Sequence, residues 1–408
     1  MNILIISKYA NPPQYGPGGR LFYLAKEFIK LGNKTALITS DSNHFAHFPN
    51  SKRRYNKQLI EGVPVYWIKT KKYKKTASAS RILSWIDFEL GLFFMRVKDI
   101  MKPDVIIVSS LSIFTVIYGL FLKKRFNSFL VFEVRDIWPL TMTEEGGFRR
   151  WHPLVVLIGL IEKIGYKYSD LIVGTMPRLD IHIKEIIGYN KPFHCSPIGF
   201  NLEDFKDSVK KKDNQFDIFF PEDKITVGYA GSFGITNDLG PFIEAIKMLR
   251  DEKKLYFLLI GQGDLKSSYE SALANCDNVK FLPRTDKQNI RYFLDKCDIL
   301  FFSTQPSKLW HYGQSLNKIV DYMLAGKPIL AAYDGYPSMI NEAGCGKFVH
   351  NNPDSIKKGL VEMANMQRTD LIEMGSKGKD WIYLNRPYSV LAKAYLERIT
   401  AEIIKKYK

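Results

Sequence analysis

The sequence has few cysteines and lacks the motifs of several enzyme classes. Its four cysteines are widely spaced and form no C-x-x-C pair, which fits reduced thiols in a cytosolic protein and argues against a structural zinc site. It contains no G-x-x-x-x-G-K-S/T loop and no G-x-S-x-G motif, so P-loop hydrolases and nucleophile-elbow hydrolases are excluded. An Asp-x-Asp pair is also absent, and we therefore expect an enzyme that needs no bound metal or other cofactor.

Long apolar runs are missing too. The most apolar segments, 86–97 and 154–161, fall short of the roughly 20 residues that cross a bilayer. Met1 and Asn2 lead straight into an apolar run at 3–6, without the basic segment and cleavage site of a signal peptide. These features predict a cytoplasmic protein without a membrane-spanning helix.

Positive charge is abundant and unevenly distributed. The chain has 408 residues and a net charge of +17, and a chain of this length predicts two domains. Residues 1–200 contain 29 Lys and Arg against 15 Asp and Glu, whereas the remaining residues contain 30 against 27. A basic half-protein points to nucleic acid, anionic lipid or a polyanionic substrate. Because no nucleic-acid-binding motif accompanies it, we disfavour nucleic acid as a partner.

Short apolar runs alternate with helical segments in both halves of the chain. This alternation predicts an α/β protein with two doubly wound parallel sheets, whose domains we expect to face each other across a cleft. We place the domains at 1–200 and 225–386, and predict that a final helix at 387–408 packs back on the first. Residues 41–60 are expected to be irregular, and 201–224 to be a solvated linker or insertion.

Glycine-rich segments follow several predicted strands. Segment 16–20 follows the first strand, and 231–234 and 261–263 follow two strands of the second domain. Glycine allows close backbone approach, so such loops can present N–H groups to an anion. Together with 311–317, the two loops of the second domain are predicted to converge on a nucleotide. A flexible crossover is the alternative for 16–20, which lacks G-x-G-x-x-G spacing.

A loop, a helix and a buried strand are predicted between residues 311 and 332. Ser315 or Gln314 is expected to cap the helix, which should stop near Gly326. Asn317 and Asp321 are four residues apart and share one face. The free N–H groups at the start of such a helix favour phosphate. The alternative is an ordinary capped helix before a core strand.

Charged residues end one buried strand of the first domain. In the segment 132–139, Arg135 and Asp136 lie where an apolar strand meets the expected cleft. Such residues are candidates for proton handling or phosphate contact. A structural pair of arginine and carboxylate is the alternative.

Basic and aromatic residues also coincide in the first domain, a pattern typical of elements that lie on anionic membranes. The alternative is that these helices only cover a parallel sheet. The predicted membrane-docking residues are Lys71, Lys72, Lys74, Lys75, Trp85, Arg149, Arg150 and Trp151.

These segments together resemble the GT-B glycosyltransferases of retaining family 4. The resemblance spans nearly the whole chain and includes 16–20, 197–205, 228–232, 259–263 and 311–346. Segments 133–139 and 315–323 are most similar to bacterial enzymes that add N-acetylated deoxysugars, such as N-acetyl-fucosamine, during capsule and O-antigen (lipopolysaccharide) assembly.

The resemblance implies two Rossmann-like domains, of which the second holds a nucleotide-sugar donor and the first an acceptor. Asp321 matches the second acid of the family's E-x7-E motif, whereas Gly313 replaces the first. Neither Ser232 nor Asp238 supplies the basic pair found in many relatives, so Lys318, Arg20 or Lys308 must contact the phosphates. The implied donor-binding residues are Gly18, Gly19, Arg20, Gly231, Ser232, Gly261, Gly263, Arg284, Tyr312, Gly313, Ser315, Asn317, Lys318 and Asp321.

The predicted catalytic residues are Asp136, Arg135 and Lys318. Lys318 and helix N-termini would stabilise the departing diphosphate, and Asp136 would orient the acceptor hydroxyl. The resemblance implies retention of configuration, with the leaving phosphate taking the acceptor proton.

The predicted function is transfer of an N-acetylated or deoxy hexose from a UDP-sugar to a lipid-linked saccharide. We expect this at the anionic inner face of the cytoplasmic membrane, where the protein would be peripheral. Two alternatives remain: a UDP-sugar 2-epimerase of the same fold, and a non-catalytic sugar-nucleotide-binding protein.

Overall fold

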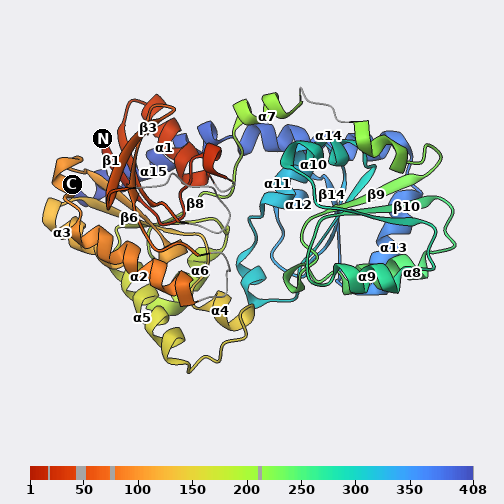
Figure 1. Cartoon of the computed structure of the whole chain (residues 1–408), viewed down its shortest axis with the longest axis horizontal. Coiled ribbons are helices and arrows are strands. Elements are labelled where there is room, and N and C mark those ends of the chain that lie inside the picture. Colours follow the sequence, from red (N-terminus) through yellow and green to blue (C-terminus); the bar gives the residue numbers. More distant parts are fainter. Residues whose placement is uncertain (17–18, 43–51, 74–78, 210–213, 408) are drawn as a thin grey trace. The chain divides into compact units, whose positions relative to one another are not determined.

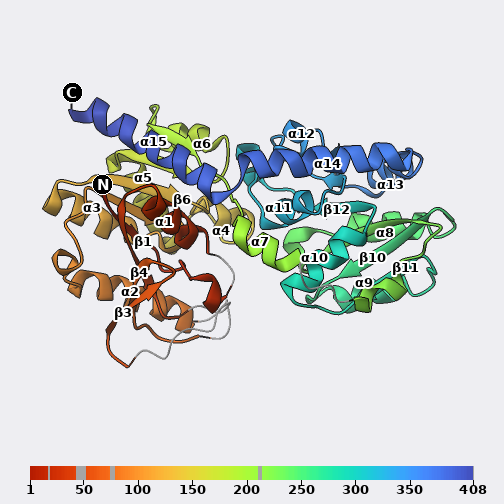
Figure 2. The same cartoon turned by 90° about the horizontal axis from the view of Figure 1, so that it is seen from above.

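The chain divides into two compact units (Figure 1). The computed structural model describes residues 1–16, 19–42, 52–73, 79–209 and 214–407. The N-terminal unit comprises Met1–Gly199 and Tyr388–Lys408, and the C-terminal unit comprises Phe200–Pro387. Each unit contains a mainly parallel sheet with helices on both faces (Figures 1 and 2).

Within the described residues, the N-terminal unit has one eight-stranded sheet in the order β3-β4-β2-β1-β5-β6-β7-β8. Only β3 and β4 pair in antiparallel fashion. The strand order reverses between β1 and β5, and ligands of such sheets bind beyond the carboxyl ends of the strands at this point. The strands are β1 (Asn2–Ile6), β2 (Lys34–Ser40), β3 (Tyr55–Ile60), β4 (Val63–Ile68), β5 (Val105–Ser109), β6 (Phe129–Val134), β7 (Leu171–Gly174) and β8 (Phe193–Cys195).

Strand β3 corrects the prediction that 41–60 is irregular. Its residues are mostly polar and only partly buried, as at a sheet edge, so the apolar alternation that marks a strand is weak. A tight turn joins β3 to β4, and both turn residues, Glu61 and Gly62, have positive φ angles of 46° and 81°. Such turns match the twist of a hairpin.

Helices cover both faces of this sheet. Apolar residues of α1 recur at helical spacing, from Leu21 through Leu24 and Ala25 to Phe28, and pack with α15 on one face. Helix α2 (Ala79–Phe94) is followed by a 3₁₀ turn at Val97–Asp99. The helices are α1 (Arg20–Lys30), α2 (Ala79–Phe94), α3 (Thr115–Phe126), α4 (Leu140–Glu144), α5 (Pro153–Tyr168), α6 (Leu179–Ile187) and α15 (Tyr388–Tyr407), with further 3₁₀ turns at Pro13–Tyr15 and Ser110–Ser112.

The C-terminal unit contains, within its described residues, a parallel sheet in the order β11-β10-β9-β12-β13-β14, which reverses between β9 and β12. Helices α8, α9 and α13 lie on one face, and α10, α11, α12 and α14 on the other (Figure 1). The strands are β9 (Ile225–Ala230), β10 (Leu255–Ile260), β11 (Val279–Leu282), β12 (Ile299–Ser303), β13 (Ile329–Ala332) and β14 (Gly346–Val349). The helices are α8 (Gly240–Met248), α9 (Lys266–Ala272), α10 (Lys287–Lys296), α11 (Asn317–Leu324), α12 (Met339–Ala343), α13 (Pro353–Ala364) and α14 (Arg368–Asn385).

The segment predicted as a linker is partly helical. It contains α7 (Leu202–Val209) and a 3₁₀ helix at Asn214–Phe219. Phe205 of α7 packs edge-on against Tyr383 of α14, with ring centroids 5.4 Å apart. Aromatic anchoring of this kind was not visible in a segment whose composition is mostly polar.

A buried ion pair joins α1, β6 and α15 in the N-terminal unit. Arg20 Nε lies 3.2 Å from Glu133 Oε1, and both side chains are almost fully buried. The Tyr395 hydroxyl of α15 donates to Glu133 Oε2 over 3.2 Å. Arg20 also donates to the Ser196 carbonyl, 2.8 Å away, and to the Pro197 carbonyl. The guanidinium therefore connects segments that are distant in sequence.

We expect Arg20→Met to destabilise the protein by about 3–5 kcal/mol, because the buried Glu133 carboxylate would lose its cation. Lys26→Met on the same helix removes only the more exposed pair with Glu61 and should cost less than about 1 kcal/mol. Urea unfolding followed by circular dichroism measures both. Equal losses in the two variants would contradict a structural role for Arg20.

Candidate functional site

Two glycine loops meet at the carboxyl ends of β9 and β10. The Phe233 N–H donates to the Gln262 carbonyl over 3.1 Å, and the Leu265 N–H donates to the Phe233 carbonyl over 3.0 Å. Gly261 has a φ of 150°, and a Cβ there would lie 1.8 Å from the Gly231 carbonyl oxygen. Glycine is thus required for the contact between the loops.

The ammonium of Lys318, in the first turn of α11, reaches the loop after β9. Lys318 Nζ donates to Asn237 Oδ1 over 2.9 Å and to the Tyr229 hydroxyl over 3.2 Å, and lies 4.5 Å from the centre of the Tyr229 ring. No carboxylate of the described residues forms an ion pair with it. Burial lowers the pKa of Lys318 to about 7, because a charged form is costly away from water.

Hydrogen bonds fix the position of Lys318 relative to the sheet. The Tyr322 hydroxyl, one turn along α11, accepts from the Ala230 N–H over 3.0 Å. The Tyr229 hydroxyl donates to the Ser232 carbonyl over 2.7 Å, and the Asn237 side-chain amide donates to the same carbonyl over 2.9 Å. Helix α11, strand β9 and the loop after it therefore form one hydrogen-bonded unit around the ammonium.

Further polar residues at this sheet edge were not predicted from the sequence. Ser303 Oγ, at the end of β12, donates to the Asn237 carbonyl over 2.6 Å. Asn351, after β14, donates to Asp238 Oδ2 over 2.8 Å, and burial raises the pKa of Asp238. Ser303 and Asn351 lie at or just after the end of a strand, and parallel strands end at a common edge of the sheet. This position was the sequence signal that could have identified them.

The structure also revises the start of α11. Its N-cap residue is Leu316, and no side chain caps it, so the predicted cap by Ser315 or Gln314 is wrong. Gln314 is instead buried, and neither its side-chain oxygen nor its nitrogen has a hydrogen-bond partner within the described chain. Gly313 has a φ of 94°, a conformation that favours glycine.

The other predicted donor-binding residues of the C-terminal unit occupy different surroundings. Asp321 faces α10: burial raises its pKa, and the charges of Lys287 and Arg291 oppose this shift. Asn317 and Ser232 are exposed, and Tyr312 and Ser315 are half-buried. Arg284 is exposed after β11, and no ion pair involves it among the described residues.

In the N-terminal unit, Arg135 and Asp136 follow β6 and lie beside Ser110, which follows β5. Ser110 Oγ accepts from the Arg135 N–H over 3.0 Å and donates to the Asp136 carbonyl over 3.2 Å. Burial raises the pKa of Asp136, against the charges of Arg135 and Arg81. Burial, and then the Arg20 guanidinium, lower the pKa of Arg135. A carboxyl with a raised pKa is a stronger base once ionised.

Lys8 is a buried cation that sequence analysis missed. It follows β1, and its Nζ donates to Ser84 Oγ over 2.9 Å and to Ser40 Oγ over 3.3 Å. Burial lowers the pKa of Lys8 to about 7, and nearby carboxylates led by Asp41 oppose this. A lysine directly after an apolar strand was the signal for a residue at the carboxyl edge of the sheet.

Arg20 and the segment before it fit the predicted donor role poorly. The Arg20 guanidinium is buried and bonded to Glu133, Ser196 and Pro197, which favours a structural role. Gly19 precedes α1 and would clash with the Tyr23 ring if it carried a Cβ. Gly18 lies outside the described residues.

The described members of the predicted membrane-docking set are exposed, except for Trp85. Trp85 is half-buried, and its indole N–H donates to the Tyr9 hydroxyl over 2.6 Å. Lys72 pairs with Asp41, whereas Lys71 is exposed. Trp151 is 71% exposed beneath the Arg149 guanidinium, and Arg150 is exposed too. Lys74 and Lys75 lie outside the described residues.

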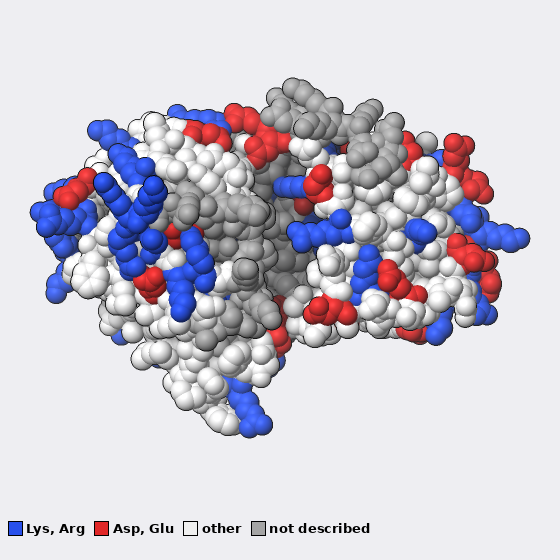
Figure 3. Space-filling view, in the orientation of Figure 1, with Lys and Arg blue, Asp and Glu red and all other residues white. Residues whose placement is uncertain are grey.

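A different set of residues forms an exposed apolar surface on the same unit. Phe94 at the end of α2 is 78% exposed, and Lys and Arg side chains gather over the region of α2 and α3 (Figure 3). We call the set on α2 the apolar face; it comprises Ile82, Leu83, Ile86, Leu90, Phe93 and Phe94. Val156, Leu157 and Leu160 of α5 are exposed as well.

Two features are absent from the described residues. No group of three or more His, Cys, Asp and Glu side chains is arranged to hold a metal ion. In the same ranges, no helix combines the length and the apolar character needed to cross a membrane.

Residues 224–366 match the family model of glycosyl transferases group 1. This span runs from β9 to α13 and includes Lys318 and both glycine loops of the C-terminal unit. No curated protein sequence matches the chain.

Solved structures match along almost the whole chain. A sucrose-phosphate synthase from Thermosynechococcus elongatus matches with a TM-score of 0.72 and 15% identity, over 99% of both chains. An E. coli structure described as trehalose-6-phosphate bound with UDP-2-fluoro glucose has a TM-score of 0.69 and 11% identity, over 97% of this chain and 98% of that one. Anabaena HepE in complex with UDP and glucose has a TM-score of 0.63 and 13% identity, over 98% and 100%.

These matches confirm the predicted GT-B fold of two Rossmann-like parallel-sheet domains. The group 1 match confirms the prediction of a glycosyltransferase enzyme. The matched structures are named for sucrose-phosphate and trehalose-6-phosphate, not for N-acetyl-fucosamine transfer, so the finer resemblance stays a prediction.

We expect Lys318→Met to raise the free energy of unfolding by on the order of 1–2 kcal/mol at pH 6, because the variant removes a charge that burial disfavours. The lysine pKa is depressed in the folded state, so its penalty is fully present below pH 7 and shrinks between pH 7 and 10.5. Urea unfolding at pH 6 and pH 9 should therefore show a larger gain at pH 6. Lys253→Met, at an exposed lysine, is the control; a destabilised Lys318→Met at both pH values would contradict the interpretation.

Proposed function

We propose that the protein transfers a sugar from a UDP-sugar to a lipid-linked saccharide at a membrane surface, with retention of configuration. The proposed sugar is an N-acetylated or deoxy hexose, and the proposed process is capsule or O-antigen assembly. The resemblance of 133–139 and 315–323 to such transferases motivates this choice of sugar and process.

The position of the Lys318 ammonium is the main support for binding of a UDP-sugar donor. It lies at the carboxyl edge of a doubly wound sheet, next to the point where the strand order reverses, and has no carboxylate partner among the described residues. A diphosphate would supply the missing negative charge, and the restored charge would stabilise the departing UDP. Two structures of the same fold are named as complexes with UDP and glucose or with a UDP-sugar analogue.

The proposed role in positioning the acceptor depends on Asp136 in the N-terminal unit. Asp136 follows β6, its backbone N–H donates to Ser110 Oγ over 3.4 Å, and burial raises the pKa of its carboxyl. We propose that it orients the acceptor hydroxyl. The acceptor oxygen would then bond to the anomeric carbon as the bond from that carbon to the UDP oxygen breaks. UDP would leave with the electron pair, and its phosphate oxygen would take the acceptor proton. We propose no metal ion for this step.

The apolar face supports a lipid-linked acceptor. Apolar side chains of α2 are exposed, and Lys and Arg side chains gather over the region of α2 and α3 (Figure 3); this combination binds the interface of anionic membranes. We propose that the N-terminal unit docks there peripherally, on the cytoplasmic side of the membrane.

We expect UDP to bind about tenfold more weakly at pH 8.5 than at pH 7, because the ammonium loses its proton as pH rises through a pKa of about 7. Calorimetry in buffers of different ionisation enthalpy should also detect proton uptake on binding. Lys318→Gln should bind weakly with little pH dependence, whereas Lys253→Gln should follow the wild type. A wild-type affinity that is flat over this range would count against Lys318 as the phosphate contact.

Activity with UDP-sugars and lipid-linked saccharides should separate the alternatives. We expect Asp136→Asn to lower kcat by about 100-fold with little change in UDP affinity, and Asp321→Ala to raise the donor KM. Wild-type rates in both variants would refute these site assignments. A sugar epimer and UDP formed from donor alone would favour the epimerase, and tight UDP binding without turnover over a panel of donors would favour a binding protein.

We expect the double variant Leu90→Ser, Phe94→Ser to bind phosphatidylglycerol-rich vesicles at least about tenfold more weakly. Each apolar side chain that becomes buried in the membrane contributes about 1.5–3 kcal/mol to binding. Leu384→Ser, at an exposed leucine of the C-terminal unit, is the control in vesicle co-sedimentation. Wild-type protein that does not sediment with anionic vesicles would refute membrane docking and leave the donor site unaffected.

A further inference from the structure

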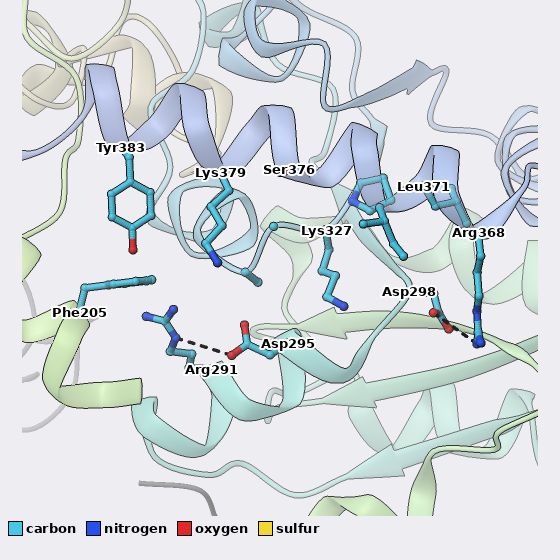
Figure 4. Close-up of a pocket in the computed structure, with 14 residues that line it drawn as sticks. Phe205, Arg291, Asp295, Asp298, Lys327, Arg368, Leu371, Ser376, Lys379 and Tyr383 are labelled. Carbon is cyan, nitrogen blue, oxygen red and sulfur yellow. Dashed lines mark ion pairs between the residues drawn. The ribbon is translucent and has the colours of Figure 1, made fainter. Parts of the chain in front are cut away.

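The C-terminal unit has a second pocket at the amino-terminal edge of its sheet, where β12 and β13 begin. Its volume is about 1020 Å³, and it is lined by residues of α7, α10, α14 and the turn before β13 (Figure 4). Asp298 and Pro328, which directly precede β12 and β13, mark this edge. Lys318 lies at the opposite, carboxyl edge, so the pocket is separate from the candidate donor site.

Two glycines bring the positive charges of this pocket together. A Cβ at Gly375 of α14 would lie 2.1 Å from the Gly326 carbonyl oxygen and 2.8 Å from Lys327 Cα. Gly326 itself has a φ of 67°, and a Cβ there would touch the Lys379 side chain at 3.2 Å. Helix α14 can approach the turn this closely only because both positions are glycine. The approach places Lys327 and Lys379 on neighbouring walls.

The pocket has more positive than negative charge. Arg291 and Arg368 each lie near an aspartate, with Arg291 Nε 3.8 Å from Asp295 Oδ2 and Arg368 Nη2 3.7 Å from Asp298 Oδ1.

Lys327 and Lys379 form no ion pair with any described residue, although both sense the charge of Asp295. Both ammonium groups extend into the space between α14 and α10 (Figure 4). These two ammonium groups can therefore donate to an anionic ligand without breaking an ion pair.

The remaining walls suit an organic ligand. Leu371 and Ile372 of α14, with Pro328, form an apolar wall, and Ile372 is 66% exposed. At the other end the Arg291 guanidinium lies 3.2 Å from the centre of the Phe205 ring, and Tyr383 points toward it. Small-molecule sites combine such apolar walls with a few convergent polar groups. Inorganic phosphate would use only the lysines.

We propose that this pocket binds an organic phosphate monoester, whose dianionic phosphate sits between Lys327 and Lys379 and whose organic part covers Leu371 and Ile372. Ammonium groups bind phosphate through charge-assisted hydrogen bonds. A sugar phosphate and a nucleoside monophosphate share this chemistry.

Calorimetry of the full chain with glucose 6-phosphate, uridine monophosphate, inorganic phosphate and glucose tests the proposal. Wild-type protein should bind at least one of the monoesters, bind inorganic phosphate more weakly, and not bind glucose. The monoester that binds more tightly shows which organic group the pocket prefers. Lys327→Gln with Lys379→Gln should lower the affinity by at least about tenfold, since each lost bond to a charged group weakens binding.

Two control variants test whether binding depends on this pocket, and not on general positive charge or on the candidate donor site. Lys377→Gln, on the same helix but paired with Glu373, should bind the monoester like wild type. Lys318→Met should also retain this binding. Failure of both monoesters to bind, equal binding by the double variant, equal affinity for inorganic phosphate, or loss of binding in Lys318→Met would overturn the proposal. Circular dichroism melts confirm that each variant is folded.

Discussion

One desolvated ammonium group determines how the C-terminal unit is built. Lys318 Nζ lies against the Tyr229 ring and Asn237, where a charge has lost much of its hydration. The surrounding loops are held by backbone contacts so close that Gly261 cannot carry a side chain. The packing therefore holds the Lys318 ammonium where its charge is unfavourable. Charged groups in such surroundings are common in ligand-binding sites.

Much of this region could be predicted from the sequence, because strand ends and glycines are visible in it. The loops after β9 and β10 and the position of Lys318 after a glycine-containing loop follow from local pattern. The positions of Asn351 and Lys8 after strands are visible too, but their roles are not. These roles, like that of Asn237, depend on hydrogen bonds to segments far away in sequence, which appear only when the strand order is known.

Composition did not predict which residues of the N-terminal unit are exposed. Trp85, one of the predicted membrane-docking residues, is half-buried on α2 and donates to Tyr9, and Phe88 of the same helix is fully buried. The exposed apolar residues are their neighbours, including Leu90 and Phe94. Residue type sets the chemistry available, whereas the helix rotation that selects the exposed face is set by packing against the sheet. Arg20 shows the same limit, since its buried partner Glu133 is 113 positions away.

The lack of an acid at position 313, where Gly313 stands, bears on the proposed function. A carboxylate close to Lys318 would raise its pKa, because an opposite charge favours the protonated form. No ion pair to Lys318 occurs among the described residues. If the protein binds a nucleotide-sugar donor as proposed, the diphosphate would supply the counter-charge, and donor binding would depend strongly on this one lysine.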